Sequence, residues 1–341
     1  MERAIKSIAP DAIDWEESSF EIRNFTADPC LETSLERCGV LHPPWVLAGG
    51  AGGKLIIVDG FKRLRWLKGR AAGACPVECF VYPAGTDRGE LLLRRIETKL
   101  SGPPLNTAEK AGVAALLGEL PGEEAAAAER LAAAGFAVRP GALAKWRRLA
   151  LEGDVLLGAA ASGEISERSA LELAAWEDGD KGEALAALRE LRCSASLQAE
   201  ILERVSELAA LENLGRADVL RAPESRAVLS HPEWNRRRKT QAFRDLLYRR
   251  RFPRLAAREE RFSREAASAG LPGGVHLVPP PSFEGEKWQL QMVFTAPEEL
   301  ETLLEKAGDF ARSPILPALM APGGTPKEKA VGSKHLKERR T

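Results

Sequence analysis

The feature that most limits how this chain can fold is its middle part, residues 106–176, which is rich in Ala and Leu and has almost no β-branched runs. Ala and Leu are strong helix formers, and apolar residues recur here with the helical period. We therefore predict an all-α region. A second helical stretch is expected over residues 181–269, because Gly270 and the glycines and prolines that follow it must end a helix.

The first hundred residues have a different pattern. Short runs rich in β-forming residues, at 45–47, 55–58 and 77–81, are separated by glycine-rich turns and helical patterns. The turn at residues 49–53, GGAGG, joins two of these runs in the manner of a hairpin. The pattern predicts a mixed α and β domain at this end of the chain.

The last part of the chain predicts a small α/β element. Residues 275–278 and 288–294 read as strands, and Thr295 is expected to cap a final helix with Glu298 at its third position. The final twenty residues have too little apolar sequence to fold alone, so we expect a disordered tail.

Composition excludes several classes of protein. The 341 residues are 44% apolar, and the five cysteines are odd in number and scattered, unlike those of a disulfide-rich secreted domain. We find no run of eighteen apolar residues and no signal-peptide pattern at the start, so we expect a cytoplasmic protein that is neither exported nor in a membrane. Cys75 and Cys79 have no second Cys or His pair nearby, which argues against a zinc site.

Charge is balanced overall and uneven locally. The sequence has 49 basic and 49 acidic residues, which argues against a protein that coats DNA by bulk charge. Residues 236–264 nevertheless hold twelve Lys or Arg against three acids. This segment is either a solvated helical face or a surface that contacts phosphates.

The segment at residues 55–65 carries the clearest site pattern. A strand-like run meets Gly60, and a helix follows with Lys62, Arg63 and Arg65 in its first turns. Glycine lets the backbone approach a ligand, helix N-terminal amides attract anions, and the basic side chains can neutralise phosphates. The pattern is typical of a phosphate-binding corner, although ordinary strand–Gly–helix junctions look similar.

Three segments in register add a family resemblance. Residues 38–46 (CGVLHPPWV), 57–65 (IVDGFKRLR) and 72–77 (AGACPV) resemble the successive boxes of the ParB/sulfiredoxin-like N-terminal domain. Residues 96–99 (IETK) and 105–111 (LNTAEKA) are similar to the junction that leads into the helical domain of that family. The resemblance covers roughly residues 5–178.

The resemblance implies a nucleotide site. In ParB proteins these elements bind CTP with a magnesium ion, so CTP or another nucleotide with Mg is the implied cofactor. Gly60, Lys62, Arg63 and Arg65 match the phosphate box, and Glu97 matches the acidic member of the second motif, which lies at the metal. Thr98 occupies the second position of that motif and is the other candidate contact. Phe61, Thr98 and Ser101 replace a Glu, an Asn and an Arg of the family pattern, which predicts weak or no hydrolysis.

Residues 123–148 have helix-turn-helix spacing. A helix is expected over residues 123–134, Gly135 supplies the turn, and Pro140 begins a second helix. Four basic side chains would then contact DNA: Arg139, Lys145, Arg147 and Arg148. Gly163, Ile165, Ser166 and Ala170 resemble the sequence that follows this motif in ParB proteins. An ordinary helical bundle would give a similar pattern.

The fold class we expect is an α+β ParB/sulfiredoxin-like domain (residues 1–103), an all-α helix-turn-helix domain (104–178), a helical region with a basic segment (179–270), a small α/β element (271–320) and a basic tail (321–341). The expected function is a ParB-like DNA-binding protein that responds to a nucleotide, and the family implies a homodimer.

Two alternative functions remain. One is a nucleotide-dependent phosphotransferase, with Asp59, Glu78 or Glu97 as its base, and the other is a non-catalytic scaffold. Glu97 is the candidate catalytic residue.

Overall fold

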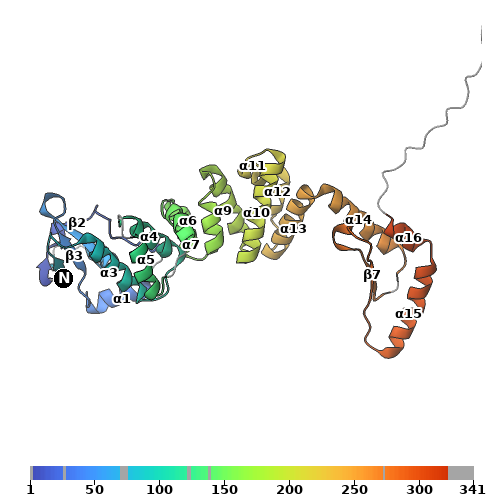
Figure 1. Ribbon diagram of the computed structural model, residues 1–341, viewed down its shortest axis with the longest axis horizontal. Coiled ribbons are helices and arrows are strands. Elements are labelled where there is room, and N and C mark those ends of the chain that lie inside the picture. Colours follow the sequence, from blue (N-terminus) through green and yellow to red (C-terminus); the bar gives the residue numbers. More distant parts are fainter. Residues whose placement is uncertain are drawn as a thin grey trace, which may run out of the picture. The chain divides into compact units, whose positions relative to one another are not determined.

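The computed structural model describes residues 3–25, 28–69, 76–120, 124–136, 140–271 and 273–321 (Figure 1). Within these ranges the chain forms sixteen α-helices and seven strands. The backbone divides into two compact units, Met1–Phe243 and Arg244–Thr341. The mixed α and β character that the sequence predicts is confirmed. The predicted domain boundaries stay predictions, and the expected tail lies outside the described residues apart from Ala321.

One five-stranded mixed sheet organises the start of the first unit. Its strand order is β1-β5-β3-β4-β2, with parallel pairing of β5 with β3 and of β4 with β2, and antiparallel pairing elsewhere. The strands are β1 (Ala4–Ile8), β2 (Ile13–Asp14), β3 (Trp45–Ala48), β4 (Leu55–Asp59) and β5 (Val77–Tyr82). The three predicted strands and the hairpin-like turn between β3 and β4 are confirmed, the turn containing a short 3-10 helix at Ala51–Gly53.

Three helices belong to the same region of the chain as this sheet: α1 (Pro29–Cys38), α2 (Phe61–Lys68) and α3 (Arg88–Leu100). Strand β4, which lies between β3 and β2, contributes Ile56, Ile57 and Val58 to the core, each at most 3% exposed. α3 contacts β4 and buries Leu91 and Ile96 completely. This packing brings the C-terminal turns of α3 to the end of β4.

The rest of the first unit is helical, as the sequence predicts. Its helices are α4 (Thr107–Gly118), α5 (Glu124–Ala133), α6 (Pro140–Ala150), α7 (Asp154–Ala161), α8 (Glu167–Leu173), α9 (Asp178–Leu191), α10 (Ala195–Glu212), α11 (Arg216–Arg221) and α12 (Pro223–Leu229). α4 begins with a capping box, in which the Asn106 side chain accepts from the Glu109 amide and Glu109 accepts from the Asn106 amide. α4 packs on α6 and α7, so it joins the sheet region to the helical region.

Helix α13 (Arg236–Arg251) crosses the division between the two units. The second unit contains α14 (Pro253–Ser268), the antiparallel pair β6 (Val275–Val278) and β7 (Gln289–Met292), α15 (Pro297–Arg312) and α16 (Ile315–Met320). The two predicted strands are confirmed, β7 being shorter than expected. Phe262, Phe283 and Trp288 form an aromatic cluster in this unit.

The predicted N-cap of α15 is wrong by one residue, and α15 is not the final helix, because α16 follows it. The N-cap is Ala296, because Pro297 occupies the first helical position, where its fixed φ is already helical. Thr295 lies one residue earlier, and its amide and hydroxyl both donate to the carboxylate of Glu299, at 2.7 and 3.0 Å, rather than pairing with Glu298.

Among the described residues, no helix combines the length and the apolar content needed to cross a membrane.

Candidate functional site

The strand-to-helix corner predicted from the sequence is formed by the end of β4 and the start of α2. Gly60 is the N-cap of α2 and has a left-handed backbone, with φ of +90°. A Cβ atom here would lie 2.9 Å from Cβ of Pro44 and 3.1 Å from Nη2 of Arg63, so the corner requires glycine. The first amides of α2 have no acceptor within the helix, which leaves the positive end of its dipole at this corner.

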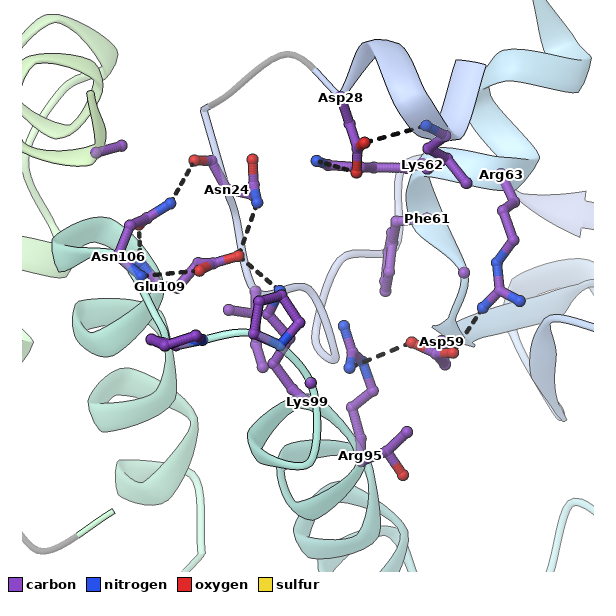
Figure 2. A pocket seen from close by; sticks show the side chains of 18 residues that line it. Asn24, Asp28, Asp59, Phe61, Lys62, Arg63, Arg95, Lys99, Asn106 and Glu109 are labelled. Atoms are coloured by element: carbon purple, nitrogen blue, oxygen red, sulfur yellow. Dashed lines mark hydrogen bonds and ion pairs between the residues drawn. The ribbon is translucent and has the colours of Figure 1, made fainter. Parts of the chain in front are cut away.

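A pocket of about 650 Å³ opens at the corner (Figure 2). Its walls come from the N-terminal turn of α2, the start of α1, the last turns of α3, the capping box of α4 and the loop that contains Asn24. Ten of the residues around it are labelled in Figure 2: Asn24, Asp28, Asp59, Phe61, Lys62, Arg63, Arg95, Lys99, Asn106 and Glu109. Four of these carry a positive charge and three a negative charge, so the lining has a net charge of +1 (4 − 3).

Asp59, the last residue of β4, holds two arginines at the floor of the pocket. Its carboxylate accepts from Nη2 of Arg63 at 2.8 Å and lies 3.2 Å from Nη1 of Arg95. Arg63 also donates to the backbone carbonyl of His42. A single carboxylate therefore fixes two guanidinium groups, that of Arg63 from α2 and that of Arg95 from α3.

Arg95 is the most buried cation that lines this pocket. It is 8% exposed, and its Nε has no hydrogen-bond partner among the described residues. Burial lowers the pKa of Arg95, and the nearby Asp59 charge partly offsets that effect. An arginine remains protonated at neutral pH even so. Arg95 is thus a desolvated cation with one donor still to be satisfied.

Glu109 organises the opposite wall, where it is 3% exposed. One carboxylate oxygen accepts from Nζ of Lys99 at 2.6 Å and from Nδ2 of Asn24 at 2.7 Å, and the other accepts from the Asn106 amide at 3.0 Å. Burial acts to raise the pKa of Glu109, but these hydrogen bonds outweigh burial and place the pKa below the ordinary value. Glu109 is therefore an ionised, fully engaged carboxylate.

The residues predicted from the sequence divide into two groups. Gly60, Lys62, Arg63 and Thr98 line the pocket. Lys62 lies 3.6 Å from the carboxylate of Asp28.

Arg65 and Glu97 lie outside the pocket lining. Arg65 forms a two-pronged ion pair with Glu21, with distances of 2.5 and 2.7 Å. Glu97 accepts from Arg130 of α5 through both oxygens, at 2.5 and 2.9 Å, and Arg130 also binds Glu90.

Sequence reasoning missed Arg95 and Lys99 as pocket residues. A signal was available, because Arg95 follows Leu91 and Leu92 at the four- and three-residue spacing of the buried stripe of α3, where a charged side chain is unusual. Lys99 lies one turn further along the same face.

None of the three proposed bases, Asp59, Glu78 and Glu97, places an unpaired carboxylate in the pocket. Asp59 is engaged by Arg63 and Arg95, and Glu97 by Arg130. Glu78 is exposed on β5 and does not line the pocket. Within the described ranges, no group of three or more His, Cys, Asp or Glu side chains has the arrangement of a metal site.

The candidate DNA-contacting helix is α6. It begins at Pro140 as predicted, and Gly135, with φ of +94°, forms the turn after α5. Lys145 and Arg148 are exposed. Arg147 is half-buried, and its Nε donates to the carbonyl of Ala114 in α4 at 3.1 Å, so this side chain joins two helices. Arg139 lies outside the described residues.

Comparisons with known proteins add one structural match. No protein-family model matches the sequence, and neither does any curated protein. A similar solved structure is the crystal structure of the C-terminally truncated chromosome-partitioning protein ParB from Caulobacter crescentus, complexed to the centromeric parS site. It is 19% identical, with a TM-score of 0.31, and the match covers 58% of this chain and 99% of that one. A TM-score of this size does not establish a common fold.

Proposed function

We propose that this protein is a ParB-like DNA-binding protein whose N-terminal pocket binds the phosphates of a nucleotide without hydrolysing it. The observation that carries the proposal is the convergence of four cationic side chains on the left-handed corner at Gly60. The sequence resemblance across residues 38–111 supports the same reading.

The chemistry of the pocket favours a phosphate group over a neutral ligand. The N-terminus of α2 offers amide donors and a positive dipole, and Arg63 adds a guanidinium beside it. Charge-assisted hydrogen bonds of this kind are about twice as strong as neutral ones. The carboxylates of Asp28, Asp59 and Glu109 hold the cations in place before a ligand arrives, which preorganises the site.

The same arrangement disfavours turnover. A general base must accept a proton near neutral pH, and a carboxylate held by lysine or arginine is a weak base. Glu109, whose pKa lies below the ordinary value, has this character. Each carboxylate oxygen of Asp59 is already engaged by an arginine. We therefore expect binding without multiple turnovers.

In this proposal, α6 contacts DNA through Lys145 and Arg148. Both side chains are exposed, and α6 follows α5 at the spacing of a helix-turn-helix motif. α4 supplies a physical connection to the nucleotide pocket, because Asn106 and Glu109 line the pocket while Ala114 accepts from Arg147 of α6. A nucleotide changes DNA affinity only if it binds two arrangements of these helices with different affinities. The homodimer implied by the resemblance is part of the proposal.

A titration of CTP, ATP and GTP into the full chain tests nucleotide binding. Arg63→Ala removes charge-assisted contacts of about 1.5–3 kcal/mol and should weaken binding roughly tenfold or more. Arg37→Ala is the matched control, because Arg37 is exposed near the end of α1 and does not line the pocket. Equal affinity of the folded Arg63→Ala variant and the unaltered protein would remove the assignment.

The salt dependence of duplex DNA binding tests the role of α6. Each phosphate contact that is lost lowers the slope of log affinity against log salt by about one unit. The Lys145→Ala, Arg148→Ala double variant should reduce both the affinity and the slope, whereas Lys54→Ala, an exposed lysine in the turn before β4, should change neither. An unchanged slope in the double variant would make α6 a purely structural helix.

A further inference from the structure

We infer that Arg95 and Lys99 of α3 take the place of a magnesium ion at this site, so that the nucleotide phosphates bind without a divalent metal. The inference rests on the proposed function and concerns how the same pocket neutralises its ligand. It departs from what the family resemblance implies, which is a nucleotide bound together with magnesium.

The carboxylates of the pocket do not fit a magnesium site. Magnesium is usually held through one or two carboxylates with near-ideal octahedral geometry. The three carboxylates in the described lining belong to Asp28, Asp59 and Glu109, and each is paired with at least one lysine or arginine. A metal ion would have to displace a cation that already neutralises each of them.

The two residues at the positions of the family's metal motif, Glu97 and Thr98, bring no carboxylate into the pocket. Glu97 lies outside the pocket lining and gives both of its oxygens to Arg130. The hydroxyl of Thr98 donates to the carbonyl of Arg94 at 2.8 Å. The carboxylate of Glu97 is therefore not available to a magnesium ion in the pocket, and Thr98 has only a hydroxyl to offer.

α3 instead supplies positive charge directly. Arg95 and Lys99 are four residues apart, lie on one face of the helix, and both line the pocket (Figure 2). Ser101, the C-cap of α3, stands where the family pattern has an arginine, and Arg95 supplies a guanidinium from within α3, six residues earlier in the chain. The Nε of Arg95 is buried and has no partner among the described residues, which is costly unless a ligand accepts its proton in a hydrogen bond.

The first arm of the test uses the unaltered protein. CTP, ATP and GTP are titrated by calorimetry in EDTA and again in excess magnesium chloride. Because magnesium neutralises part of the phosphate charge, we expect the dissociation constant in EDTA to be equal to or lower than that in magnesium. Binding that is seen only with magnesium, or is weakened about tenfold or more by EDTA, would overturn the inference and leave the proposed function standing. No binding in either buffer would overturn both.

The second arm assigns the effect to Arg95. In EDTA, Arg95→Ala should weaken binding about tenfold or more, since it removes charge-assisted contacts. Arg95→Lys keeps the charge and protects the fold but lacks Nε and the guanidinium fork, so a loss of about fivefold is expected. Arg94→Ala is the matched control, because Arg94 is exposed, pairs with Glu90 and lies outside the lining. Wild-type affinity in the folded Arg95→Lys variant, or in the folded Arg95→Ala variant, would refute the assignment.

Discussion

Glu109→Gln should lower the stability of the first unit, and the loss should depend on pH. The substitution keeps the size of the side chain but removes the charge that neutralises Lys99, which is 23% exposed at its side chain. Breaking a buried ion pair costs about 3–5 kcal/mol, and the partial exposure of Lys99 reduces this to about 2–3 kcal/mol. For a unit of this size the melting temperature should fall by about 4–12 °C.

The pH dependence follows from the direction of the pKa shift. The folded pKa of Glu109 lies below its ordinary value, because hydrogen bonds from Lys99, Asn106 and Asn24 outweigh the effect of burial. Such a carboxyl stabilises the fold above its unfolded pKa and loses that contribution as the pH falls through the folded pKa. The difference in stability between the unaltered protein and Glu109→Gln should therefore be complete at neutral pH and shrink below about pH 4.3.

Thermal melts followed by circular dichroism between neutral and acidic pH measure this difference. Glu119→Gln is the matched control, because Glu119 is exposed at the C-terminal end of the same helix and should change stability by less than about 0.5 kcal/mol. A Glu109→Gln variant as stable as the control at neutral pH, or one whose deficit is the same at every pH, would refute the reasoning.

Four further outcomes are expected. Gly60→Ala should destabilise the protein by about 1–3 kcal/mol in thermal melts and weaken nucleotide binding, because a left-handed residue gains a Cβ 2.9 Å from Pro44; normal stability and affinity would argue against the tight corner. Arg147→Ala should cost about 1–2 kcal/mol of stability, since it breaks the bond to Ala114, whereas Arg148→Ala should be neutral in the same melts. Arg65→Ala should leave nucleotide affinity within about twofold in calorimetry, as the Arg65 side chain pairs with Glu21 outside the pocket. Phosphate release with each nucleotide, magnesium and duplex DNA should not exceed that of Arg63→Ala, and sustained turnover that Arg63→Ala abolishes would favour the phosphotransferase reading.

The sequence predicts those parts of the fold where local pattern and tertiary structure agree. The helical period of residues 106–176 and the β-rich runs before it match the observed helices and strands. The corner at Gly60 was predictable because a strand, a glycine and a helix stand next to one another in the chain. β1 and β2 were missed, since β1 exposes four of its five residues and β2 is two residues long, so neither has a pattern to detect.

The composition of the pocket depends on packing that local sequence does not encode. Successive residues of a helix are about 100° apart, so Arg65 points about 200° away from Arg63 although both belong to the same basic run. The same rotation separates Glu97 from Arg95 and Lys99 on α3. The contact between α3 and β4 decides which face of α3 is turned toward α2 and the pocket. This tertiary contact is visible only in the structure.

The central claim is that the phosphates of a nucleotide lie at the N-terminus of α2 between Arg63 and Arg95, and a crystal structure of the full chain grown with CTP, or with whichever nucleotide binds more tightly, tests it most directly. We predict density for the phosphates within hydrogen-bond distance of the first amides of α2, of Arg63 and of Nε of Arg95. A nucleotide bound elsewhere on the chain, with this pocket unchanged, would contradict the account.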